Sequence, residues 1–186
     1  PVSDLLGEYT GAGLIFGATG GVMEAALRTV ADILENKDLP DFEYTQVRGV
    51  EADVKEATVN LAGKDIKVAV AHSTAAARKL LDSIKDGTNN DYAFIEVMGC
   101  SGGCVCGGGQ PIIDAQTLMS IDIRAERAKA LYEEDKILPE RKSHKNSQIN
   151  KLYEEFLGEP NGHLSHELLH TSYSKREIYP DSVLED

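Results

Sequence analysis

The chain has 186 residues, 41% hydrophobic and 27% charged, which is typical of a globular protein with one buried core and a small appendage. Its formal net charge of −12 disfavours nucleic acid and anionic membrane surfaces as partners, because Lys and Arg must neutralise the phosphates of both. No apolar run approaches the roughly 20 residues that cross a bilayer and the start lacks a signal-peptide layout, so we expect a cytoplasmic protein with no membrane partner.

The first part of the chain predicts a helix followed by strands. A glycine-rich loop over residues 5–21 leads into a helix over 22–34, for which Thr19 is available as the N-cap. Runs rich in β-branched and aromatic residues then predict three strands, with a hairpin turn at residues 62–65. These strands cover residues 42–50, 57–61 and 66–71.

A second helix and a fourth strand complete the predicted sheet lobe. The helix covers residues 74–84 and ends near Gly87, and the strand covers residues 92–98 and ends at the cysteines. The predicted fold class is therefore α/β, with a four-stranded mixed sheet flanked by helices.

Beyond Pro111 the sequence predicts helices only, over residues 123–137, 147–157 and 162–170. We expect this all-helical extension to wrap the sheet domain or to cover a partner lobe. The predicted domains are residues 1–114 and residues 115–186.

Three cysteines lie within seven consecutive residues, at Cys100, Cys104 and Cys106. Thiolates are the ligands of iron–sulfur clusters, and the glycines around them allow a tight curl of the backbone toward a cluster. By chemistry alone, a zinc site, a redox disulfide or chance clustering could produce the same C-x3-C-x-C string. The cysteine cluster predicts a metal site without fixing the metal.

The residues around these cysteines resemble the third signature motif of iron-only hydrogenases. The match covers Glu96, Met98, Cys100, Gly103, Cys104, Gly107, Gly108, Gly109, Gln110 and Pro111. The segments 11–28, 141–144 and 166–170 also look like parts of that family, the last two resembling its small-subunit-type tail. A fragment of a hydrogenase that interconverts dihydrogen with two protons and two electrons is therefore expected.

The resemblance implies a role for each of five residues. Cys100 would bind the four-iron cubane of the H-cluster, and Cys104 would bridge that 4Fe-4S cubane to the two-iron subsite. Met98, Phe16 and Gly17 would line the pocket of the subsite. Cys106 stands where the family commonly has a non-ligating residue.

The resemblance also implies partners. The family takes two further cysteine ligands, a proton-delivering thiol and a lysine from earlier motifs that have no counterpart here, so we expect an incomplete or absent cluster and an inactive fragment. Because the first residue is Pro1 and not Met, we expect a cut piece that lacks the N-terminal half of the catalytic domain. Ferredoxin or an NAD(P)-linked subunit would exchange electrons with the parent protein, and the fragment could form a homodimer.

Two alternatives stay open. A hydrogenase-like assembly factor or sensor would share the cysteine loop without turning over hydrogen. The string His166-Glu167-Leu168-Leu169-His170 also matches the H-E-x-x-H pattern of zinc proteases. Glu177 is the main candidate for the third zinc ligand, but it lies too close in the chain for the usual distant carboxylate.

Overall fold

The computed structural model describes residues 7–40, 43–49 and 52–175. The chain divides into two compact units, the first ending at Asn146 and the second beginning at Ser147. The predicted division of the chain into residues 1–114 and residues 115–186 remains a prediction.

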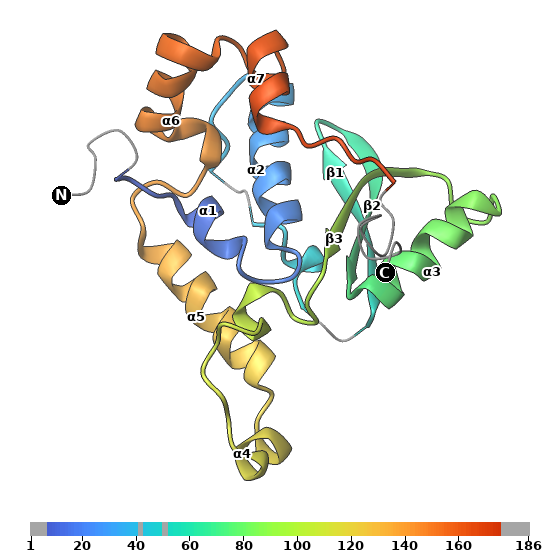
Figure 1. Cartoon of the computed structure of the whole chain (residues 1–186). Helices are drawn as coiled ribbons and strands as arrows, with labels where there is room; N and C mark the ends of the chain where they lie inside the picture. Colours follow the sequence, from blue (N-terminus) through green and yellow to red (C-terminus); the bar gives the residue numbers. More distant parts are fainter. Residues whose placement is uncertain (1–6, 41–42, 50–51, 176–186) are drawn as a thin grey trace, which may run out of the picture. The chain divides into compact units, whose positions relative to one another are not determined.

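The described part of the first unit contains a three-stranded mixed sheet in the order β1-β2-β3. Strands β1 (Val54–Leu61) and β2 (Lys64–His72) are antiparallel, whereas β2 and β3 (Tyr92–Met98) are parallel (Figure 1). The β1–β2 hairpin turns through Ala62 and Gly63, both of which have positive φ. Positive φ at two consecutive residues matches the twist of a tight hairpin, so the predicted turn is confirmed.

Helices cover both faces of this sheet. Helix α2 (Gly21–Glu35) packs on one face and helix α3 (Thr74–Lys85), which joins the two parallel strands, packs on the other (Figure 1). The core under α2 consists of Met23, Leu27, Ala31, Val47, Val59, Leu61, Val68 and Val70. The core under α3 consists of Ala69, Ala71, Ala76 and Leu80. The α/β class is confirmed, and the sheet lies between two helical layers.

The strand predicted over residues 42–50 is wrong. Its described residues form a short 3-10 turn, Thr45–Val47, and not a strand. Val47 is buried in the core under α2, while the side chains of Glu43 and Arg48 form ion pairs with other elements. Tertiary contacts have overridden the β-propensity of the segment, so the described residues contain three strands where four were predicted.

The remaining helices of the first unit are α1 (Gly11–Ile15), α4 (Ala115–Ser120) and α5 (Ile123–Ile137). Helix α5 packs against α1 (Figure 1). The sequence predicted α5 but neither α1 nor α4. Gly11 is needed for the packing of α1 against α5. A Cβ at this position would lie 1.9 Å from Asp135 Oδ1, so only glycine lets α1 approach α5 so closely.

The second unit is helical throughout its described residues. It contains α6 (Ser147–Leu152), a π-helical turn over Tyr153–Leu157 and α7 (His163–Leu169). The helices predicted over 147–157 and 162–170 are confirmed, except that the first changes from α to π geometry after Leu152.

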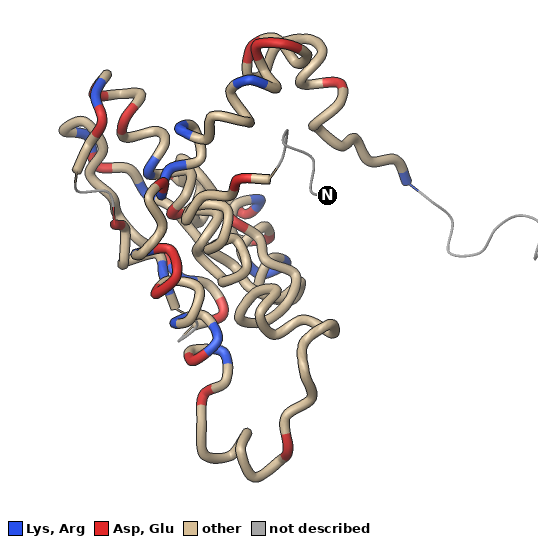
Figure 2. Tube along the Cα trace, turned by 90° about the vertical axis from the view of Figure 1, so that its left-hand side faces the viewer, with Lys and Arg blue, Asp and Glu red and all other residues tan. Residues whose placement is uncertain are grey.

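A network of buried charges joins α2 to α5 and to the segment that follows α5. Arg28 and Asp135 are both 0% exposed and are joined by two hydrogen bonds of 2.8 Å. Glu24 accepts hydrogen bonds from Arg28 and Arg48, and Arg141 donates to Asp135. Along the described part of the chain, acidic and basic residues are interspersed (Figure 2). The buried ion pairs thus stabilise the packing of α2 against α5 within the first unit.

Candidate metal centre

The cysteine loop begins where the parallel strands β2 and β3 end side by side. His72 and Met98 are register partners at that edge, and the N–H of Ser73 donates a 2.8 Å hydrogen bond to the Met98 carbonyl. Ligands of open α/β sheets bind at the carboxyl ends of the strands. The position of the loop therefore agrees with a binding role.

The backbone of the loop is fixed to the glycine-rich segment before α2. The Thr19 N–H donates to the Gly102 carbonyl at 3.2 Å, and the Val105 N–H donates to the Gly17 carbonyl at 3.0 Å. Gly103 has φ +100°, and a Cβ on it would lie 2.5 Å from the Gly17 oxygen. Glycine is required at 103 by both conformation and space. Residue 17, predicted to line the site, thus contacts the cysteine loop.

Glu96 links the end of β3 to the start of α2. Its side chain is buried and accepts hydrogen bonds from the N–H groups of Gly20, at 2.8 Å, and Met23, at 2.7 Å. Burial raises the pKa of the Glu96 carboxyl, and these two hydrogen bonds oppose the rise. Thr19 was predicted to cap α2, but the N-cap is Gly20 and a carboxylate distant in sequence satisfies the helix terminus.

Two arginines of α5 also hold the cysteine loop in place. Arg127 donates to the carbonyls of Val105, at 2.8 Å, and Pro111, at 3.0 Å, and Arg124 Nη1 lies 3.4 Å from Ser101 Oγ. The sequence analysis missed both arginines. No local pattern could have identified them, because their partners are backbone or hydroxyl oxygens about 20 residues away.

The thiols are available on this fixed loop. Cys100 and Cys104 are exposed free thiols, and Cys106 is half-buried. A Cβ on Gly107 would lie 3.9 Å from Cys100 Sγ and 3.2 Å from the Cys104 carbonyl, so the loop curls closely beside the first thiol. Met98 is half-buried at the end of β3 and Phe16 is 43% exposed. Their role as pocket lining, and that of Gly17, remains a prediction.

The donor set fits part of an iron–sulfur cluster. Cys100 and Cys104 offer two thiolates on a glycine-lined loop, as such a cluster requires. The described residues contain no group of three or more His, Cys, Asp or Glu that could hold a metal ion. The remaining ligands of a cluster would have to come from outside these residues.

The H-E-x-x-H string lies on α7 in the second unit. His166 and His170 are both exposed, with ring centroids 4.4 Å apart. A catalytic zinc needs three protein ligands, and within the described ranges no three-ligand group exists. Glu177, the candidate third ligand, lies outside the described residues. The geometry therefore gives the zinc-protease alternative no support.

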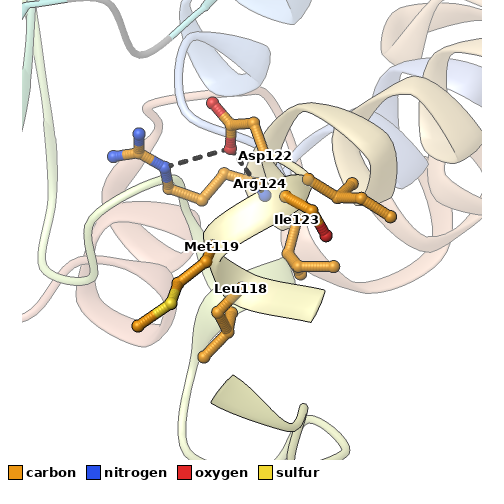
Figure 3. A pocket seen from close by; sticks show the side chains of 7 residues that line it. Leu118, Met119, Asp122, Ile123 and Arg124 are labelled. Atoms are coloured by element: carbon orange, nitrogen blue, oxygen red, sulfur yellow. Dashed lines mark hydrogen bonds and ion pairs between the residues drawn. The ribbon is translucent and has the colours of Figure 1, made fainter. Parts of the chain in front are cut away.

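The cavity in Figure 3 is separate from the predicted site residues. It has a volume of about 500 Å³ and is lined by residues 118–124 at the junction of α4 and α5. Asp122, in its wall, caps α5 by accepting a 3.0 Å hydrogen bond from the Arg124 N–H. None of the residues lining it is a cysteine or a predicted pocket residue.

Two family models match the chain. The iron-only hydrogenase large subunit, C-terminal domain, matches residues 1–108, and the iron hydrogenase small subunit matches residues 121–176. The chain belongs to the iron-only hydrogenase family. As a member of that family, it corresponds to the C-terminal part of the hydrogenase, as the resemblance of its motif predicted.

Individual hydrogenases agree with this assignment. Iron hydrogenase 1 of Clostridium pasteurianum is 48% identical over 172 residues, which are 91% of this chain and 29% of that protein. The NADP-reducing hydrogenase subunit HndD of Solidesulfovibrio fructosivorans is 44% identical over 92% of this chain and 28% of its own length. A structure of the FeFe-hydrogenase HydA1 from Chlamydomonas reinhardtii matches with 36% identity and a TM-score of 0.62, covering 85% of this chain and 45% of that one. The chain thus spans less than a third of the curated hydrogenases.

Proteins with another description are also similar to this chain. The protein NAR1 of Arabidopsis thaliana is 29% identical over 93% of this chain and 36% of its own length. A probable cytosolic Fe-S cluster assembly factor of Drosophila virilis is 30% identical over 83% of this chain and 31% of its own length.

Among the described residues no helix is long and apolar enough to span a membrane. The cytoplasmic location remains a prediction.

Proposed function

We propose that this chain carries the last cysteine loop of an iron-only hydrogenase that interconverts dihydrogen with two protons and two electrons. The observation that supports this most strongly is the loop itself: two exposed thiols, Cys100 and Cys104, on a backbone fixed against Gly17 and Thr19. A fixed loop presents ligands without reorganisation, which favours tight metal binding.

Each proposed site residue has a distinct task. Cys100 would be a thiolate ligand of the 4Fe-4S cubane, and Cys104 would be shared between the cubane and the two-iron subsite. When bound, this H-cluster supplies the activation of hydrogen and the path for electrons. Met98, Phe16 and Gly17 would shape the pocket beside it and exclude water. Two thiolates are half of the ligand set, so the complete cluster would need the N-terminal half of the catalytic domain.

The proposed electron partners follow from the family. Electrons would pass to ferredoxin or to an NAD(P)-linked subunit, and the similarity to an NADP-reducing hydrogenase subunit supports the second of these. A homodimer of this chain alone is a further proposal, in which surface that belongs against the missing half becomes covered.

The test uses the full-length parent protein after cluster maturation. We expect Cys100→Ser and Cys104→Ser each to lose bound iron and acid-labile sulfide together with hydrogen uptake, because both thiolates are proposed ligands. The matched control is Cys106→Ser, which removes a thiol from the same loop and should retain iron and activity. Full iron content in both ligand variants would refute the proposal.

A hydrogenase-like assembly factor or sensor is the second candidate, since assembly factors of about 30% identity are among the relatives. The identity to hydrogenases is higher, at 48% and 44%, which supports the enzyme. Hydrogen uptake separates the two: a parent protein with a full complement of iron and sulfide but no uptake would favour the second candidate.

A further inference from the structure

Two histidines lie one turn apart at the end of α7, in the second unit. The N–H of His170 donates to the His166 carbonyl at 3.1 Å, so His170 closes the last turn of α7 as its C-cap, although its own backbone is extended (φ −102°, ψ 133°). The two imidazole rings are in edge contact, with centroids 4.4 Å apart. We infer that His166 and His170 form a two-ligand site for a divalent transition-metal ion, independent of the iron–sulfur function.

Both rings are free to bind an ion. The side chains of His166 and His170 are exposed, and within the described part of the chain neither ring makes a hydrogen bond or an ion pair. Residues four apart on a helix lie on the same face, so a rotation of the side chains is enough to direct a nitrogen of each ring at one ion. Binding therefore needs no unfolding and breaks no hydrogen bond or ion pair of the described residues; the two rings only leave their edge contact with each other.

The donor atoms determine the kind of ion. Two imidazole nitrogens suit Cu²⁺, Ni²⁺ and Zn²⁺, whereas Mg²⁺ and Ca²⁺ prefer oxygen ligands. His163 precedes His166 by three residues on the same helix, but the three histidines do not converge into a three-ligand group among the described residues. Water or a donor from another molecule would fill the remaining positions, and the site differs in this respect from a catalytic zinc centre.

Such an ion would stabilise the helix that carries it. Helix α7 has only 7 residues, and isolated helices shorter than roughly 12–15 residues are marginal in water. An ion held by both histidines binds the helical conformation in preference to the unfolded one, so binding shifts the equilibrium toward the helix. The order of the tail is therefore expected to respond to the metal.

The experiment is a calorimetric titration of the 186-residue chain with Ni²⁺, with the cysteine thiols alkylated because free thiols also bind the metal. The wild type is compared with His166→Gln, His170→Gln and the matched control His163→Gln, since glutamine retains high helix propensity. We expect one Ni²⁺ per wild-type chain. Affinity should be roughly tenfold or more lower in the first two variants, which lose one of two linked ligands, and nearly unchanged in the control.

Two results would overturn the site: wild-type protein that binds no Ni²⁺, or variants at 166 and 170 whose affinity equals that of the control. Far-UV circular dichroism of each variant verifies that the chain is folded. The titration does not involve the iron–sulfur loop, so a negative result leaves the proposed hydrogenase function untouched. A failure of the proposed hydrogenase function would likewise leave the nickel-binding site untouched.

Discussion

Gly103 is where the cysteine loop comes closest to the glycine-rich segment. A methyl group at this position would lie 2.5 Å from the Gly17 oxygen and 2.8 Å from the Thr19 nitrogen. We predict that Gly103→Ala lowers the free energy of unfolding by about 2 kcal/mol or more, from backbone strain together with overpacking. The measurement is the urea unfolding midpoint of this chain.

Gly108→Ala is the control for that substitution. Apart from its two chain neighbours, no residue has an atom within 4 Å of a Cβ at Gly108, and its φ is not positive. Its unfolding midpoint should stay near that of the wild type. Equal midpoints for the two alanine variants would show that the close contact at Gly103 does not hold the loop.

Ser73 has a backbone conformation that glycine favours, with φ 87° and ψ 151°. Its Oγ accepts a 3.2 Å hydrogen bond from the Ala76 N–H at the start of α3. Ser73→Gly should raise the free energy of unfolding by roughly 1 kcal/mol, because relief of strain exceeds the small cost of a glycine cap. Ser73→Ala keeps the strain and loses the cap, so its unfolding midpoint should fall. A glycine variant less stable than the alanine variant would contradict this reading of the strain.

At the scale of elements, α5 is held against α2 by the buried Arg28–Asp135 pair. Asp135→Asn would leave the buried guanidinium of Arg28 without its charged partner on α5 and would remove one of the two carboxylate partners of Arg141, the other being Glu43. We predict a loss of about 3–5 kcal/mol, as for other buried pairs broken on one side. The control is Glu133→Gln, which removes an exposed pair with Lys129 on the same helix and should have little effect on the unfolding midpoint.

The same network predicts that acid destabilises the fold. Burial raises the pKa of Asp135, but hydrogen bonds from Arg28 and Arg141 outweigh it and leave the pKa below its usual value. The pKa of Asp32 is lowered by Lys142 against the effect of burial, and that of Glu43 is lowered by Arg141. A carboxyl with a lowered folded pKa stabilises the fold above its unfolded pKa, near 4, and this contribution disappears as the pH falls through the folded value.

Glu96 acts in the opposite direction, because its raised pKa favours the folded state at pH values below its ordinary one. Asp38, Asp114 and Asp122 also have a lowered pKa, so six described carboxyls with a lowered pKa stand against one with a raised pKa. A net fall in stability below about pH 4 is therefore predicted. The unfolding midpoint in urea, measured between pH 7 and pH 3, checks this prediction. The fall should be smaller in Asp135→Asn, and an unchanged slope in that variant would exclude Asp135 as a source.

The sequence predicted most of these elements because their signals are local. The helices at 22–34, 74–84 and 123–137 and the strands at 57–61, 66–71 and 92–98 are confirmed. What failed depends on distant contacts: Val47 is buried beneath α2, Gly11 packs against Asp135, and Glu96 caps α2 in place of Thr19. Periodicity and propensity carry no information about such partners.

On the scale of the whole molecule, residues 115–146 belong to the compact unit of the sheet, although the predicted tail begins at residue 115. We predict that a chain ending at Asn146 unfolds cooperatively, because the ion pairs of Arg28 and Asp32 are complete within it. A chain ending at Asp114 would lack Asp135 and Lys142 and should not fold. Urea unfolding followed by circular dichroism distinguishes them, and cooperative unfolding of the shorter chain would favour the predicted boundary.

The predicted site can be judged on the same scale. The motif located the loop that the glycine-rich segment and α5 hold in place, and the family assignment agrees with it. The ligand roles of Cys100 and Cys104 and the pocket formed by Met98, Phe16 and Gly17 remain predictions. They depend on a cluster and on a part of the parent protein whose residues cannot be derived from this sequence.

The most direct measurement is a crystal structure of the matured parent protein, with the anomalous signal of iron used to locate the metal. Iron bonded to the sulfurs of both Cys100 and Cys104, within one cluster, is the predicted result. Two sulfurs that point apart without iron, or that close around a zinc ion, would contradict the proposed role of this loop in hydrogen chemistry.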